Sequence, residues 1–416
     1  MLQGNNKIKI TMKYSLKNPP PVAYRPDPIV WVRWLLFFIF LMITGVILTR
    51  LFGKYADALS FWMLTVGGAC AVWLGCFLFS ALLWLMQQII ANGYDERREE
   101  WLLQKTRQSR RALQVLQAKF ITVYPDNSAT QSPLEAMMAN DRIIAAQTDR
   151  RGKKGINHSQ LAAKRTETVK DIVTRALADL LLPIKTTLQQ LPVSQPVNVL
   201  LESTSSLDSD EVKSVFVAQW QSAGLTNPFA FIAGSGVQVV EHWLDHCIHE
   251  KALLLVLALQ IDPEQTDNTG ETAVALLLGN RLTQTTITPT VLLHRPDRSS
   301  ADTLDTGMKQ AAYHVPLHGD DVQYLWYSGL TPAQCSAVMT HSNAFPAGAV
   351  EQENLIQPDR SIGQAGVATC WLMFAAAANA ADITGHPHMV ITGDSKTDEI
   401  WSAIIAPVDF HQEKDA

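Results

Sequence analysis

Serine and histidine side chains stand at the few places in this sequence where their types and spacing could support chemistry. Ser235 lies in the glycine-containing stretch FIAGSGVQ, residues 231–238. A serine hydroxyl attacks a carbonyl carbon only when a neighbouring base takes its proton. His314 and His318, in YHVPLHGDD, are the bases that we consider for it.

Three histidines, His242, His246 and His249, share the segment EHWLDHCIHE. On a helix, residues three and four apart lie on one face, so His242 and His246 could chelate one ion, with His249 or Cys247 nearby. The alternative is an ordinary amphipathic helix with exposed histidines. Because no fourth ligand is close in the sequence, we predict no metal here and keep the three histidines as a weak candidate.

Two glycine turns and one acidic turn complete the candidate sites. The turns at 234–236 and 363–366 could bind an anion at a helix N-terminus, although glycines at such turns more often allow tight packing. Asp394, in TGDSKTDE, is explained equally well as a turn cap. The chain has no P-loop, kinase signature, nucleophile elbow or HExxH motif. We therefore predict no cofactor.

Regularly alternating strands and helices must position these residues. From residue 197 the pattern predicts a strand, a helix, a strand, a helix and then two strands, and from residue 288 the same cycle starts again. Alternation of this kind predicts an α/β fold with a mainly parallel sheet covered on both faces. The repetition predicts two similar α/β halves.

This layout resembles the thiolase-like fold of the condensing enzymes. LLLVLALQID followed by ETAVALLLGNRL is similar to the end of its first half, and SIGQAGVATCWLMFAAAANAA followed by MVITGDSKTDEIWSAIIAP to the end of its second. The resemblance implies a cysteine nucleophile in the first half, where only Ser235 stands, and histidines at two turns of the second. Gln364 stands where one of them would follow glycine, and an amide is no general base. The resemblance therefore implies a degenerate site and no enzyme.

Two apolar runs, at 29–52 and 59–90, precede the α/β region. Each exceeds the ~20 residues that a helix needs to cross a bilayer, so they predict a transmembrane hairpin. Lysine and arginine are concentrated before the first run and after the second, which predicts that both ends are cytoplasmic. The net charge of −5 gives no basic face for nucleic acid, and the five scattered cysteines are typical of a reducing compartment.

The predicted organisation has five parts: a cytoplasmic polar tail at 1–28, a transmembrane helical hairpin at 29–91, a charged helical stalk at 92–118, a first α/β half at 119–285 and a second half at 286–416.

Hairpin, stalk and thiolase-like ending together resemble the type VI secretion lipase-effector adaptor family. The resemblance implies a non-enzymatic adaptor of the bacterial inner membrane, with a cytoplasmic α/β domain whose protein partners are a secreted lipase effector and the valine-glycine repeat spike protein. Two alternatives remain open. One is a membrane-associated thiolase-like acyl-transfer enzyme that uses Ser235. The other is a structural subunit of an inner-membrane complex, packed through Gly67, Gly68, Ala69 and Gly75.

Overall fold

The chain forms two compact units, residues 1–108 and 109–416. The computed structural model describes residues 19–52, 58–124, 131–164, 166–280, 287–315, 317–319, 321–393 and 397–408. Each unit is described by itself.

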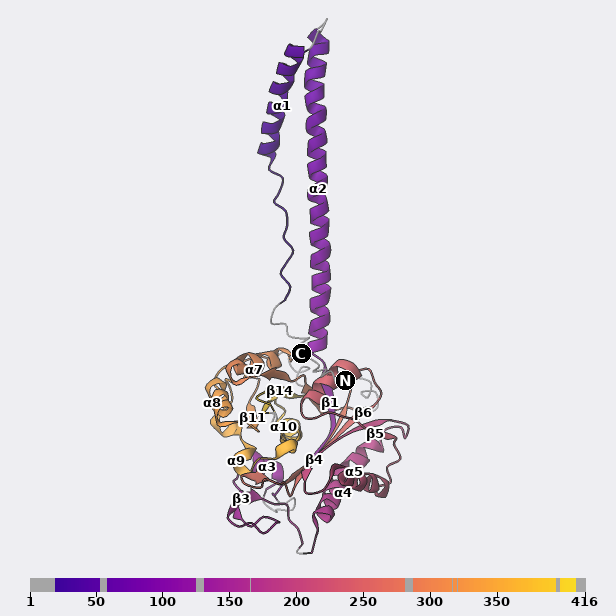
Figure 1. The fold of residues 1–416 in the computed structure, drawn as a ribbon, viewed down its shortest axis with the longest axis vertical. Coiled ribbons are helices and arrows are strands. Elements are labelled where there is room, and N and C mark those ends of the chain that lie inside the picture. Colours follow the sequence, from indigo (N-terminus) through magenta and orange to yellow (C-terminus); the bar gives the residue numbers. More distant parts are fainter. Residues whose placement is uncertain are drawn as a thin grey trace, which may run out of the picture. The chain divides into compact units, whose positions relative to one another are not determined.

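Two long helices, α1 (Trp31–Phe52) and α2 (Ala58–Ser109), make up most of the first unit (Figure 1). They run antiparallel: the hydroxyls of Thr49 and Thr65 are 3.1 Å apart, and farther along Trp73 Nε1 donates to the Trp34 carbonyl at 2.9 Å. By length and composition both are able to cross a membrane, and almost none of their apolar side chains are buried within the protein. Their placement in a bilayer stays a prediction.

Three of the residues expected to pack the hairpin against other spans, Gly67, Gly68 and Gly75, have open space beside them. A Cβ added at Gly67, Gly68 or Gly75 would meet nothing within 4 Å, whereas Ala69 is buried.

The predicted stalk helix extends too far. The helix ends at Ser109, and Ala112–Ile121 form strand β1, so the helical prediction for 112–118 is wrong. Pairing with strands on both sides, far away in the sequence, overrides the local helical pattern.

The second unit is built on one large mixed sheet. Its strands in the first half are β1, β4 (Val197–Ser205), β5 (Phe229–Phe231), β6 (Leu253–Ile261) and β8 (Thr272–Gly279). Those in the second half are β9 (Val291–His294), β11 (Tyr324–Ser328), β12 (Leu355–Ile356), β13 (His388–Gly393) and β14 (Ile400–Pro407). A short strand, β10 (Asp297–Ser299), pairs with β14.

The spatial order β12-β11-β13-β14-β9-β1-β8-β6-β4-β5 reveals the duplication. Numbered within its half, each set of strands has the order third, second, fourth, fifth, first. In each half the fifth strand is antiparallel to its neighbours, and the two first strands pair with each other. The prediction of two similar α/β halves is confirmed in topology.

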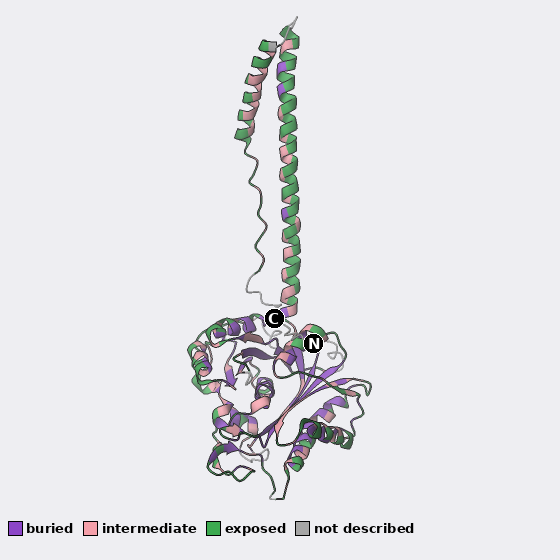
Figure 2. Cartoon of the chain, in the orientation of Figure 1, coloured by how far each residue is buried: buried purple, intermediate pink, exposed green. Residues whose placement is uncertain are grey.

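Helices lie in three layers around this sheet. The outer layers are α4 (Val169–Leu188) with α5 (Ser209–Ser222), and α7 (Leu304–Tyr313) with α8 (Pro332–His341). The middle layer holds α6 (Gln238–His242), its π-helical continuation η1 (Trp243–Cys247), and α10 (Thr369–Thr384), which contacts strands of both halves. Strands β6 and β8 are buried along their whole length, and so is most of α10; the central strands are accordingly purple in Figure 2. Among the residues that the structure describes, three helices are long and apolar enough to span a membrane, and α10 is the one inside the core.

Smaller elements complete the unit: α3 (Pro133–Met138), α9 (Pro358–Ser361), the 3₁₀ turns η3 (Ala301–Thr303), η4 (Gln352–Asn354) and η5 (Gly366–Ala368), and a separate sheet of β2 (Ala145–Gln147), β3 (Ile156–Ser159) and β7 (Thr269–Gly270).

Candidate functional site

A small cavity, here called the turn cavity, forms where the turn before α6 meets the start of α10. Its volume is about 40 Å³. Both halves line it, with Glu202, Ser235, Gly236, Val237, Gln238, Gly366, Val367, Thr369, Cys370, Gly393 and Trp401. The sequence-predicted turn therefore lies at the junction of the halves.

Ser235 is exposed at the rim of this cavity, between two glycines with positive φ. A Cβ on Gly234, where φ is 153°, would come within 2.5 Å of Val239 Cγ2. Gly236 has a φ of 57°, in the left-handed region that favours glycine. The two glycines thus shape the turn that presents the hydroxyl of Ser235.

Glu202, from β4, places a carboxylate in the turn cavity. Its two oxygens each accept a hydrogen bond of 3.2 Å from the Gly236 amide, and Oε2 also accepts one from Trp371 Nε1 at 2.5 Å. The N-terminal end of a helix favours negative charge. The Glu202 carboxylate thus occupies the position at this helix start where an external anion would bind.

Sequence reasoning missed Glu202, because its partners lie 34 and 169 residues away and no local pattern marks it.

Cys370 also lines the turn cavity, in the first turn of α10, and only 8% of it is exposed. A helix N-terminus favours the thiolate form, whereas a nearby carboxylate disfavours it. The sequence presented this residue only as one of several scattered cysteines.

The two histidines considered as bases do not line this cavity. His314 follows α7 and is buried; burial, aided by the charge of Arg295, lowers its pKa to about 3. His318 is exposed, and its Nδ1 lies 3.6 Å from Asp321 Oδ2. The expectation that either assists Ser235 is therefore not met, and the group available there is Glu202.

Gln364, which stands where the resemblance implies a histidine, is held in place by hydrogen bonds of its backbone. Its carbonyl accepts from the Gly270 amide at 2.9 Å and from Gln260 Nε2 at 2.6 Å, and its amide donates to the Asn268 carbonyl at 2.9 Å. Its exposed side chain lines a different cavity from Ser235. The structure does not bring the two predicted residues together.

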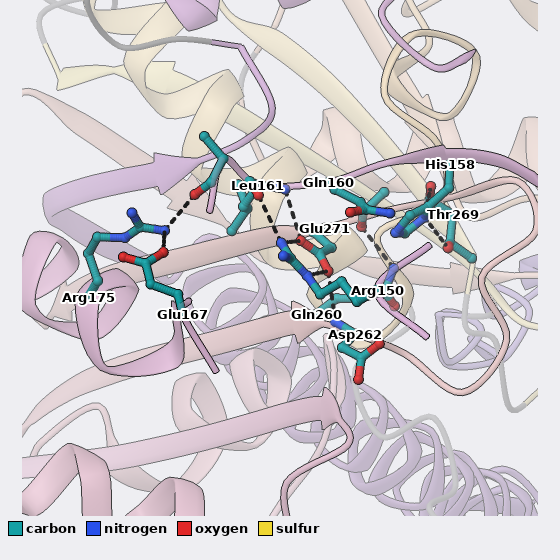
Figure 3. A network of polar contacts seen from close by, with 12 residues as sticks. Arg150, His158, Gln160, Leu161, Glu167, Arg175, Gln260, Asp262, Thr269 and Glu271 are labelled. Carbon is teal, nitrogen blue, oxygen red and sulfur yellow. Dashed lines mark hydrogen bonds and ion pairs between the residues drawn. The ribbon is translucent and has the colours of Figure 1, made fainter. Parts of the chain in front are cut away.

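A buried ion pair fixes the loop that carries Asn268 and Gly270 (Figure 3). Glu271 is fully buried and accepts from Arg150 Nε at 2.7 Å, from the Leu161 amide at 2.8 Å and from the Asp262 amide at 3.0 Å. A buried carboxylate with all these donors is well compensated. The ion pair therefore holds the loop that carries Asn268 and Gly270 in one position.

A larger cavity, here called the edge cavity, lies against the loop that carries Asn268, beyond the ends of β11 and β12. Its volume is about 690 Å³. It is lined by Asn140, Arg142, Ile144, Asn157, Asn268, Tyr327, Leu355, Gln357, Asp359, Arg360, Ser361 and Gln364. Sequence analysis proposed only Gln364 among these residues.

Asp359 lies between the edge cavity and a neighbouring hollow on α8. Its carboxylate accepts from Ser328 Oγ at 2.5 Å and from the Gly329 amide at 2.7 Å, while burial raises its pKa.

The histidine cluster gathers only in part. The rings of His242 and His246 are 4.8 Å apart, centre to centre, and no group of three metal-binding side chains forms among the residues that the structure describes. Asp394 lies outside those residues.

Comparison with known proteins finds no matching family model and no similar curated protein. Solved structures resemble the chain at low identity. The tetronic acid condensing enzyme AbyA1 has 14% identity and a TM-score of 0.45, covering 70% of this chain and 99% of its own. The ishigamide ketosynthase/chain length factor has 13% and 0.49, covering 71% and 99%. Human mitochondrial 3-ketoacyl-CoA thiolase has 10% and 0.47, covering 72% and 99%.

These comparisons correct one expectation. The structures similar to this chain carry the names of thiolase-fold enzymes, and none of the three is a secretion adaptor. The prediction of a non-enzymatic adaptor for a lipase effector and a secretion spike is therefore wrong. What stands is a mixed α/β unit that resembles the thiolase-like enzymes in its fold.

Proposed function

We propose that this chain is a membrane-associated thiolase-like protein that transfers an acyl group, with Ser235 as the acyl acceptor. The observation that carries this proposal is the turn cavity at the junction of the two halves, which the exposed Ser235 and Glu202 both line.

The chemistry requires a donor with a good leaving group, such as an acyl thioester. Ser235 Oγ attacks the thioester carbonyl carbon, the hydroxyl proton passes to the Glu202 carboxylate, and the C–S bond breaks. The proton then returns to the departing thiolate, which leaves as a thiol. A carboxylate is a modest base, so its contribution depends on its position next to the hydroxyl.

The hairpin would hold this unit at a membrane surface. The lengths and apolar character of α1 and α2, and the cations that flank them in the sequence, support this part of the proposal. A donor with a long acyl chain would be concentrated at the same surface.

The test is acylation of the full chain in detergent by an alkyne-labelled acyl-CoA, followed by peptide mass spectrometry. We expect an ester on Ser235 that is lost in Ser235→Ala and kept in Ser222→Ala, an exposed serine on α5. Glu202→Gln should slow acylation about 10²- to 10⁴-fold, the usual contribution of a general base.

Neutral hydroxylamine distinguishes an acyl group on Ser235 from one on Cys370, because it cleaves thioesters and leaves oxygen esters intact. A label found on Cys370 would show that the Cys370 thiol, and not Ser235, accepts the acyl group. A chain that takes up no acyl group at either residue would contradict the proposal.

A further inference from the structure

The edge cavity is separate from the turn cavity. Ser235, Glu202 and Cys370 do not line it, and its volume of about 690 Å³ lies within the ~300–1,000 Å³ of small-molecule sites.

Two arginines give this cavity its charge. Arg142 and Arg360 line it, both are exposed, and neither forms an ion pair with the residues that the structure describes. Five arginines elsewhere in the unit, Arg150, Arg151, Arg175, Arg295 and Arg298, each lie within 3.4 Å of a carboxylate oxygen. The edge cavity therefore offers positive charge that the protein itself does not neutralise.

The one carboxylate of the lining is occupied. Asp359 accepts from Ser328 Oγ and from the Gly329 amide, at 2.5 and 2.7 Å. Its hydrogen bonds are thus directed to the end of β11 and leave the two guanidinium groups for a ligand.

Amide side chains line the rest of the cavity and are suited to a polar ligand body. Asn157, Asn268 and Gln364 are exposed there, and amides both donate and accept hydrogen bonds. The backbone beneath them is fixed: the Asn268 amide donates to the Asn157 carbonyl at 2.7 Å, and the Gln364 amide donates to the Asn268 carbonyl at 2.9 Å.

We propose that the edge cavity binds a small phosphate ester, with Arg142 and Arg360 on the phosphate and the three amides on a hydroxyl-bearing body. Arginine forms paired hydrogen bonds with phosphate oxygens, which makes it the preferred side chain for such a group. Ile144 and Leu355 are the two aliphatic side chains among the twelve lining residues, and they would contact the apolar edge of the ligand body.

The test is calorimetric titration of the full chain in detergent with ribose 5-phosphate, inorganic phosphate and ribose as probes. We expect ribose 5-phosphate to bind at least tenfold more tightly than inorganic phosphate, and ribose to show no saturable binding. Arg142→Gln and Arg360→Gln should each weaken binding of ribose 5-phosphate by about 10- to 100-fold, because each removes one charged contact with the phosphate.

Lys251→Gln is the matched control, since it removes one exposed positive charge at the start of β6, away from this cavity, and it should leave binding unchanged. Acyl uptake is measured in parallel, so that loss of the phosphate site and loss of the acyl acceptor can be distinguished. Equal binding of the double arginine variant and the unchanged chain would overturn the proposal. So would the absence of saturable binding of both phosphate probes at ~10 mM.

Discussion

Two histidines of the second unit are kept neutral by burial. His388 is fully buried, its Nδ1 accepts from Trp326 Nε1 at 2.9 Å, and its Nε2 lies 2.9 Å from Thr384 Oγ1. Burial, and then the charge of His386, lowers the pKa of His388 to about 3, and His314 has a pKa of about 3 as well. Trp326, which donates to His388, lies 62 residues before it in the sequence.

We predict that the unfolding free energy falls as the pH falls from about 6.5 toward 3. In this window the unfolded chain binds protons on both histidines and the folded chain does not, so stability is lost on acidification. Each histidine adds a slope of about 1.4 kcal/mol per pH unit. Urea titrations between pH 5 and 7 measure it, and His388→Asn should remove one histidine's share. An unchanged slope in that variant would contradict the assignment.

Glu271 allows a second prediction for a single residue. Glu271→Gln leaves the Arg150 guanidinium, which is mostly buried, without its carboxylate, and we expect a cost of about 3–5 kcal/mol. Glu399→Gln breaks the more exposed pair with Arg298 and should cost about 0–1 kcal/mol. Denaturant unfolding of both variants gives the comparison, and similar losses would refute the stabilising role of the buried pair.

The elements of the second unit were largely predictable, because alternating patterns mark strands and helices locally. The main error was β1, whose partners β8 and β9 lie far along the chain. The candidate site was predictable only in part. Glycine spacing located the turn at Ser235, but Glu202 lines the turn cavity, held by Trp371, through tertiary contacts that no local pattern records.

Helix α10 sets a strict limit on side-chain size in the middle layer. Ala376 is fully buried in the core that joins both halves, so Ala376→Leu should destabilise the unit by about 1–3 kcal/mol through overpacking. Asp382→Leu, on the exposed face near the end of the same helix, should change stability by less than about 0.5 kcal/mol. Thermal and denaturant unfolding would show this contrast, and equal effects would argue against close packing at Ala376.

At the scale of the whole molecule, the contacts separate residues 1–108 from residues 109–416. We predict that a chain of residues 109–416 folds and stays soluble, because its three apolar clusters all lie within it. Its circular dichroism and melting should match those of the same unit in the full chain.

The full chain should resist alkaline carbonate extraction from membranes, and its release by carbonate would contradict the proposed anchor.

Helix α10 also bears on how this protein is made. It has the apolar character of a membrane span and yet belongs between the two halves, where it contacts strands of each. It leaves the ribosome after the first half and strands β9 to β12 of the second, so the centre of the unit stays open until late in synthesis. A chain stopped before Thr369 would expose the inner faces of both halves to chaperones and proteases. The proposed membrane anchor requires that α1 and α2 are inserted while α10, although similarly apolar, is not.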